Sequence, residues 1–191
     1  MEPIEKRSDS RSSFVEASPA QVFAAMSDSA RVARWWGPAG FSSTIHQFDF
    51  RPGGTWLLTM HGPDGKDYPN ESRFTRIVSG ELLEIEHLSG HHFVLSIALQ
   101  PFDHGTQIRW SQTFDTVEHY EQIAEFVAGA NEQNLQRLAA EVLRSRNVGQ
   151  PFHPVGRRWR PPKSYVRRQK STSCHSFERS RTCLQPCILK P

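Results

Sequence analysis

The first 173 residues of this 191-residue chain contain no cysteine, because the three cysteines are Cys174, Cys183 and Cys187. A domain without disulfides suits a reducing compartment, so we expect a cytoplasmic protein. No run of about 18 apolar residues occurs, which argues against a membrane-spanning helix. The sequence also lacks a phosphate-binding loop, a dinucleotide-binding glycine pattern, a nucleophile elbow and an HExxH pair. We therefore expect no cofactor and no metal, and we assign no catalytic residue.

Charge is divided unevenly along the chain, although the whole sequence carries only +3. Residues 147–191 contain ten lysines and arginines, six prolines and one acid, Glu178. Such a segment buries too little apolar surface to offset its ordering entropy, so we predict a basic, disordered tail. Out-of-frame or read-through coding is an alternative origin for it. Nucleic acid is expected to bind only nonspecifically, through this tail.

The rest of the chain changes from a helical to an alternating period. Helices are predicted at 18–28, where Ser18 is a good N-cap, and at 30–36, before a Gly-Pro pair that stops the helix. Strands are predicted at 12–17, 41–50, 55–61, 72–78, 81–88, 91–102 and 106–115. Their connecting loops are too short for crossover helices, so the sheet is predicted to be an antiparallel meander.

Alternation also assigns faces within two of these strands. His46, Phe48 and Phe50 are predicted to share one face of their strand. Trp56 and Met60 are predicted to lie together on one face of the next strand.

The last predicted element is a long helix, capped by Thr116 and ending near Arg144. Its apolar face consists of Tyr120, Ile123, Val127, Ala130, Leu138 and Val142. Glu141 and other acids fall mostly away from this face. Two amides, Asn131 and Asn134, project toward it, and a buried amide without partners costs about 1–3 kcal/mol. Either they bond to strand backbone or water, or they face a cavity and bond to a ligand.

Together these patterns predict one α+β domain over residues 12–146, preceded by a flexible N-terminus at 1–11. A curved antiparallel sheet of six or seven strands would wrap around the C-terminal helix and bury its apolar face.

Four segments in this order carry a family resemblance: ARWWGPAGF (33–41), FDFRPGGTW (48–56), TMHGPDGKDYPNE (59–71) and GANEQNLQRLA (129–139). They resemble the domain named for the activator of Hsp90 ATPase, within the START-like or SRPBCC superfamily. The resemblance covers about 12–145 and implies the helix-grip fold, in which a sheet grips the C-terminal helix with a pocket between them. The strand and helix pattern alone leads to the same architecture. Fold alone does not determine activity.

Aromatic side chains on the predicted strands exceed what a minimal core requires, and a pocket needs apolar walls with a few polar groups. We therefore expect a small apolar or amphipathic ligand between sheet and helix. Trp35 and Trp36 are adjacent, so one of them is expected to line the pocket mouth or stack over the sheet edge. The candidate cavity residues are Trp35, Trp36, Phe48, Phe50, Trp56, Met60, His61, Tyr68, Phe74, His87, Phe93, Trp110, Val127, Asn131 and Asn134.

Two other functions stay open. A protein-interaction module, such as a co-chaperone-like regulator, predicts an exposed apolar patch around Trp35 and Trp36. An acid–base enzyme, similar to START-like cyclases and dehydratases, requires titrating groups inside the pocket. The candidates for such groups are His61, Asp67, Tyr68, Glu71 and His87.

Overall fold

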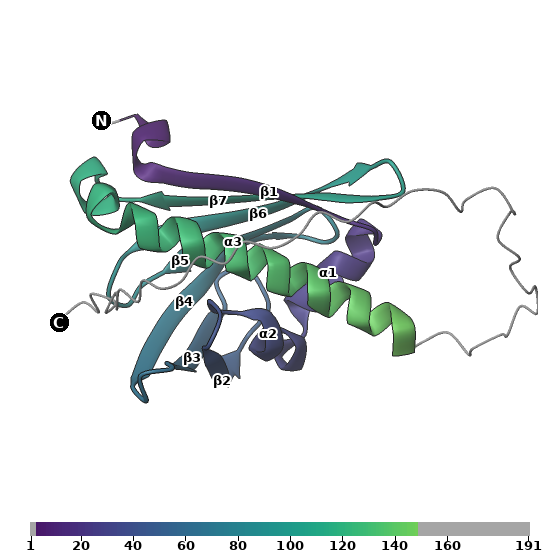
Figure 1. Ribbon diagram of the computed structural model, residues 1–191, viewed down its shortest axis with the longest axis horizontal. Helices are drawn as coiled ribbons and strands as arrows, with labels where there is room; N and C mark the ends of the chain where they lie inside the picture. The colour runs from purple at the N-terminus through teal and green to yellow at the C-terminus, as the bar shows by residue number, and fades with distance from the viewer. Residues whose placement is uncertain (1–2, 149–191) are drawn as a thin grey trace, which may run out of the picture. The chain divides into compact units, whose positions relative to one another are not determined.

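The computed structural model describes residues 3–148, with side chains described as far as residue 144. The tail predicted at 147–191 lies outside this range, except for its first two residues, which end the last helix. In chain order the elements are η1 (Ile4–Arg7), β1 (Ser8–Val15), α1 (Pro19–Ser27), α2 (Ser29–Trp35), β2 (Ser42–Phe48), β3 (Thr55–His61), β4 (Asp67–Val78), β5 (Leu82–His87), β6 (Phe93–Phe102), β7 (Gly105–Phe114) and α3 (Val117–Val148). The long helix α3 crosses one face of a curved sheet (Figure 1). The predicted α+β helix-grip arrangement is confirmed.

The seven strands form one antiparallel sheet in the order β1-β7-β6-β5-β4-β3-β2. Strands β2 to β7 follow one another as the predicted meander, because short turns join them. β1 pairs with β7 along its whole length, with Ser8 opposite Thr113 and Val15 opposite Thr106. Helices α1 and α2 then carry the chain from this edge of the sheet to the other edge, where β2 lies (Figure 1).

The prediction of a flexible N-terminus at 1–11 was wrong for most of that stretch, because η1 precedes a strand that already begins at Ser8. Hydroxyl groups pair this strand with β7. Ser8 Oγ lies 2.8 Å from Thr113 Oγ1, and Ser10 Oγ lies 3.1 Å from Ser111 Oγ. Polar cross-strand pairs stabilise an edge strand without producing a hydrophobic pattern in the sequence.

The predicted helix caps are confirmed at both ends of the domain. Ser18 Oγ accepts from Gln21 N at 3.3 Å, while Ser18 N donates to Gln21 Oε1 at 2.9 Å. Thr116 Oγ1 accepts from His119 N at 3.1 Å. These side chains satisfy N–H groups that have no partner in the first turn, so α1 and α3 begin directly after their caps.

Strand β2 departs from the predicted alternation at a β-bulge. Its register with β3 shifts between Ile45 and Gln47. Ile45 and Phe48 both pack against the core, whereas exposed His46 bonds through Nε2 to Thr59 Oγ1 at 2.8 Å. The prediction that His46 shares a face with Phe48 was therefore wrong, because a bulge adds one residue and re-aims the side chains around it.

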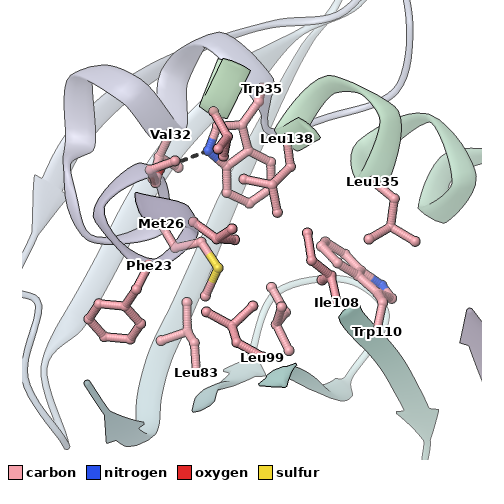
Figure 2. Packing of buried hydrophobic residues seen from close by; sticks show 14 of the residues in the cluster. Phe23, Met26, Val32, Trp35, Leu83, Leu99, Ile108, Trp110, Leu135 and Leu138 are labelled. Atoms are coloured by element: carbon pink, nitrogen blue, oxygen red, sulfur yellow. Dashed lines mark hydrogen bonds between the residues drawn. The ribbon is translucent and has the colours of Figure 1, made fainter. Parts of the chain in front are cut away.

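The core lies between the sheet and the three α-helices. Figure 2 shows Met26 of α1, Trp35 of α2 and Leu138 of α3 directed toward the side chains of the strands, including Leu99 of β6. The exposed fractions of Met26, Trp35 and Leu138 are 1%, 1% and 0%. Burying one such side chain contributes about 1.5–3 kcal/mol, so this contact holds the helices on the sheet.

The loop at residues 36–41, between α2 and β2, is held by side chains of α3. Gly37 N donates to Asn134 Oδ1 at 2.8 Å, and Ala39 N donates to Gln133 Oε1 at 2.7 Å. Gly37 has φ +102°, and a Cβ there would lie 2.9 Å from Met60 Cε. Glycine at this position therefore allows both the left-handed backbone and the close approach of β3.

Arg137 completes this contact, and we call Gln133, Asn134 and Arg137 the loop clamp. The Arg137 guanidinium donates to the carbonyl oxygens of Gly37 at 2.6 Å, Pro38 at 2.9 Å and Arg34 at 2.9 Å. Burial lowers the pKa of Arg137. The carbonyl dipoles take the place of water around its charge, since buried donors must be paired.

A buried carboxylate joins α3 to α2. Glu141 is 3% exposed, and its Oε1 lies 3.1 Å from Arg31 Nε and 2.6 Å from Arg34 Nη2. Burial alone would raise the pKa of Glu141, but hydrogen bonds from Arg34, Arg144 and Arg31 lower it to about 2. The prediction that Glu141 points away from the buried face was wrong, because cations on α2 offset the cost of its burial.

Replacing Arg137 with methionine should destabilise the domain by about 1.5–3 kcal/mol, because the loop carbonyls lose a charged donor. Urea unfolding of the variant measures the change. Gln136→Met is the matched control, since Gln136 is exposed and bonds to Glu132 on its own helix; it should stay within about 0.5 kcal/mol of wild type. Equal losses in the two variants would contradict a clamp at Arg137.

Glu141→Gln should destabilise the domain by about 1.5–3 kcal/mol at pH 7, through weaker bonds to the arginines. A carboxylate with a lowered pKa stabilises the fold above its ordinary value of 4.5, and this contribution is lost as pH falls toward about 2. The difference from wild type should therefore shrink between pH 5 and pH 2 in urea unfolding. Glu132→Gln, on the exposed face of α3, serves as the control and should show little change.

Candidate functional site

Three tryptophans from distant parts of the chain meet in the interior, and we call Trp36, Trp56 and Trp110 the tryptophan cluster. Trp36 follows α2 directly, Trp56 lies on β3 and Trp110 lies on β7. The Trp36 ring centroid lies 4.7 Å from that of Trp56 and 6.0 Å from that of Trp110. Trp56 and Trp110 are 2% and 1% exposed, whereas Trp36 is only partly buried. Trp36 is therefore the member of the cluster that retains contact with solvent.

This cluster depends on the curvature of the sheet. β3 and β7 are separated by three strands, so in a flat sheet they would lie about 19 Å apart. One Trp36 ring nevertheless contacts side chains from both strands. The two halves of the sheet therefore curve toward the same side chain, and the apolar face beneath α3 is concave.

The tryptophan cluster contains two buried polar atoms, one on Trp56 and one on Trp110. Trp56 Nε1 and Trp110 Nε1 are buried, and neither has a hydrogen-bond partner among the residues that the structure describes. By contrast, Trp35 Nε1 donates to the Ala25 carbonyl oxygen at 2.9 Å, the dashed bond in Figure 2. An unpaired buried donor costs about 1–3 kcal/mol, and most buried donors are paired. These two indole groups are thus available to a hydrogen-bond acceptor.

Trp35 and Trp36 point to different surroundings, as their adjacency predicted. Trp35 is 1% exposed and packs in the core between α1 and α3. The prediction of an exposed apolar patch around the pair was wrong, because Trp35 is buried with its N–H bonded and Trp36 packs against Trp56.

Aromatic candidates from β2 to β4 surround Trp56. Phe74 is fully buried and stacks parallel to Trp56 at 5.9 Å. The rings of Phe48 and Phe50 meet the Phe74 ring edge-on at 5.2 Å and 5.1 Å. Met60, partly buried, packs against the same core. These residues form the apolar wall on the β3 side of the tryptophan cluster.

The candidates His87, Phe93 and Val127 lie in a second, smaller group beside Phe114. The His87 ring stacks on Phe93 at 4.5 Å, and the Phe93 ring lies 5.6 Å from that of Phe114. Burial lowers the pKa of His87. The ring nitrogens of His87 lie 2.9 Å from Asn70 Oδ1 and from the backbone carbonyl of the next loop. His87 is therefore already bonded within the protein.

Both asparagines on the apolar face of α3 are buried, at 3% for Asn131 and 7% for Asn134. Asn134 accepts from the Gly37 backbone. Asn131 Nδ2 donates to Asp9 Oδ2 at 3.0 Å, and Arg11 binds the same carboxylate at 3.0 Å. Each amide thus has a partner within the protein, although neither is the strand backbone or water named by the first interpretation: Asn134 binds loop backbone and Asn131 binds a side-chain carboxylate.

The candidates His61 and Tyr68 bond to carboxylates at the β3–β4 turn, and they also contact Thr44 and Phe41, respectively. His61 Nδ1 lies 2.6 Å from Asp67 Oδ1. The Tyr68 hydroxyl donates to Asp64 Oδ2 at 2.9 Å, and this bond raises the pKa of Tyr68. Among the described residues, neither side chain has a hydrogen bond or ring pairing with the tryptophan cluster.

The sequence matches the family model described as activator of Hsp90 ATPase homolog 1-like protein over residues 16–142. The chain belongs to this family. Two segments that carried the resemblance, ARWWGPAGF at 33–41 and GANEQNLQRLA at 129–139, contact each other through the loop clamp. Sequence reasoning missed Gln133 and Arg137 as partners of the loop. Gln133 and Arg137 are four residues apart and therefore lie on one face of the helix, beside Asn134. This spacing was the signal in the sequence that could have identified them.

Solved structures share the fold of this family member. A protein from Arthrobacter aurescens has a TM-score of 0.68 at 22% identity, over 75% of this chain and 90% of its own. A protein from Nitrosomonas europaea has a TM-score of 0.68 at 17% identity, over 76% and 99%. An AHSA1-like protein from Aeromonas hydrophila has a TM-score of 0.60 at 19% identity, over 76% and 99%. A comparison with curated proteins gave no match. At these identities the likeness establishes the fold alone.

The acid–base candidates do not converge on one interior position. Asp67 and Glu71 are exposed, while His87 is buried. Among residues 3–144, no group of three or more His, Cys, Asp or Glu side chains is arranged to hold a metal ion. Within the described part of the chain, no helix has the length and apolarity needed to cross a membrane.

A histidine contact links the β5–β6 loop to the start of α3. His91 Nδ1 lies 2.8 Å from His119 Nε2, so one of these ring nitrogens donates its N–H to the other. The two rings repel if both are charged. Burial and the nearby His119 lower the pKa of His91. The neighbouring His92 lies 2.8 Å from Asp115 and 3.3 Å from Glu86, and the bond to Asp115 raises the pKa of His92. Adjacent residues in one loop therefore respond to acid in opposite directions.

Acidification from pH 7.5 to 5.5 should affect stability oppositely in variants of these two histidines. A lowered pKa means that His91 loses stabilisation as pH falls below the ordinary value of 6.5, so His91→Gln should reduce the loss on acidification. A raised pKa means that His92 stabilises the acidic form, a contribution lost as pH rises, so His92→Gln should increase the loss. Urea unfolding at both pH values checks the signs, and changes in the same direction would contradict this account.

Proposed function

We propose that this domain binds a small apolar or amphipathic molecule against the tryptophan cluster, between the sheet and α3. The observation that carries the proposal is the pair of buried, unpartnered indole N–H groups, Trp56 Nε1 and Trp110 Nε1. Ligand sites in proteins combine apolar walls with a few polar groups that fix orientation. The aromatic wall around Trp56 and these two donors have that composition.

A ligand oxygen near the tryptophan cluster would accept from one or both indoles and remove a penalty of about 1–3 kcal/mol for each. The apolar body of the ligand would lie against the wall formed by Phe48, Phe50 and Phe74. Partly buried Trp36 is the residue at which such a molecule would enter, because its ring is partly exposed and contacts the rings of Trp56 and Trp110. The ligand is thus an apolar molecule with at least one hydrogen-bond acceptor. We place this activity in the cytoplasm, because the described domain contains no cysteine.

A second candidate is a protein-interaction module or co-chaperone-like regulator, which the family description suggests. Exposed aromatic side chains favour it: Phe126 on α3 is 66% exposed and Phe102 at the end of β6 is 60% exposed. Large exposed apolar side chains mark contact sites when they gather into patches. This function would use the outer surface and leave the tryptophan cluster closed.

Trp110→Phe and Trp56→Phe should weaken binding of an acceptor-carrying probe about 2- to 10-fold, because each removes one N–H donor. A suitable probe is the naphthyl ketone prodan, followed by its emission. Its parent 2-dimethylaminonaphthalene lacks the carbonyl and should bind wild type and both variants alike.

Trp35→Phe is the control for the loss of indole volume, because the Trp35 N–H is bonded within the protein. It should destabilise the fold without discriminating between the two probes. Equal weakening of both probes by Trp110→Phe, or no binding of prodan to wild type, would contradict the proposed site.

A further inference from the structure

A hydroxyl, an imidazole and a carboxylate are joined in series on the opposite, exposed face of the sheet. Thr44 Oγ1 on β2 lies 2.8 Å from His61 Nε2 on β3. His61 Nδ1 lies 2.6 Å from Asp67 Oδ1 on β4. The side chains of His61 and Asp67 are 39% and 67% exposed, and Thr44 is exposed as well. This arrangement is separate from the tryptophan cluster and plays no part in the proposed ligand binding.

The carboxylate determines how His61 presents itself to Thr44. Asp67 is an acceptor, so the short contact requires a proton on Nδ1 of His61. In the neutral ring, Nε2 then carries a lone pair and accepts the hydroxyl hydrogen of Thr44. A hydroxyl bonded to a base that is itself oriented by a third group is the arrangement by which proteins activate oxygen nucleophiles.

The same face carries a natural internal control. His46 Nε2 lies 2.8 Å from Thr59 Oγ1, a contact of the same length between the same two residue types. Among the described residues, His46 has no carboxylate contact, in contrast to His61. The bulge in β2 places His46 on this exposed face. The two threonines differ in whether a carboxylate orients their histidine and also in exposure, because Thr44 is exposed whereas Thr59 is half-buried.

We propose that exposed Thr44, activated by His61, accepts the acyl group of activated esters and becomes covalently acylated. Thr44 Oγ1 attacks the acyl carbon, and its proton passes to His61 Nε2. The bond from the acyl carbon to the leaving oxygen then breaks, and that oxygen takes the proton from His61 or leaves as an anion. The products are an ester on Thr44 and a free alcohol or phenol, with no change of oxidation state. Asp67 is a positioning residue, because it acts through His61.

The test uses the full chain and p-nitrophenyl acetate. Nitrophenolate release gives the rate, and peptide mass mapping gives the acetylated residue. We expect Thr44 to be acetylated at least about tenfold faster than Thr59. His61→Gln should lower the Thr44 rate about 100-fold, the scale of a general base. His46→Gln is the matched control and should leave the Thr44 rate unchanged.

Further variants separate chemistry from folding. Thr44→Val should abolish labelling in that peptide, and Thr44→Ser should restore it. Asp67→Asn should slow labelling and change its dependence on pH, which a merely structural role would not do. All five substitutions lie on the exposed face, and circular dichroism checks that the fold is retained. Equal acetylation of Thr44 and Thr59 in wild type, or an unchanged Thr44 rate in His61→Gln, would overturn the proposal. Neither result bears on binding at the tryptophan cluster.

Discussion

The grip of α3 on the 36–41 loop is the contact on which the interior depends. Asn134 and Arg137 bind Gly37 from its two sides, one accepting from its N–H and the other donating to its carbonyl. This backbone directly follows Trp36, so the clamp fixes where the Trp36 ring enters the space between β3 and β7. A single helix therefore supports both the packing of the core and the geometry of the candidate site.

Burial of polar groups is the second feature that organises this domain. Asp9, Asn131 and Glu141 are all less than 10% exposed, and each is bonded to residues of another element. Such contacts are directional, whereas apolar packing is not. They fix the rotation and the axial position of α3 on the concave face. Trp56 and Trp110 depart from this pattern of paired polar groups, and their indole N–H groups are therefore the donors proposed to bind a ligand.

The sequence patterns predicted most of this fold because they report local chemistry. The Ser18 and Thr116 caps and the shared core position of Trp56 and Met60 follow from spacing within one element, and the meander follows from the short loops between successive strands. Errors arose where a distant partner decided the outcome. Ser8 is in a strand because Thr113 lies opposite, and Glu141 is buried because Arg31 and Arg34 lie on another helix.

The candidate site was predictable in composition and less so in geometry. Aromatic excess on the strands pointed to Trp56 and Trp110, and the adjacent Trp35–Trp36 pair pointed to Trp36, yet nothing local shows that β3 and β7 curve onto one ring. The β2 bulge is likewise invisible in the alternation around His46 and Phe48. It depends on the register with a neighbouring strand, and that register is a property of the sheet.

The pairing of β1 with β7 has a consequence for how the chain is made. Strand β1 leaves the ribosome long before β7, the strand with which it pairs, because Ser8 is opposite Thr113. The hairpins from β2 to β7 can form in order as they emerge, but β1 must stay unpaired until they are complete. Contacts so distant in sequence slow folding. A strand rich in serine is well suited to that interval, because a solvated, polar segment resists premature association with other nascent chains.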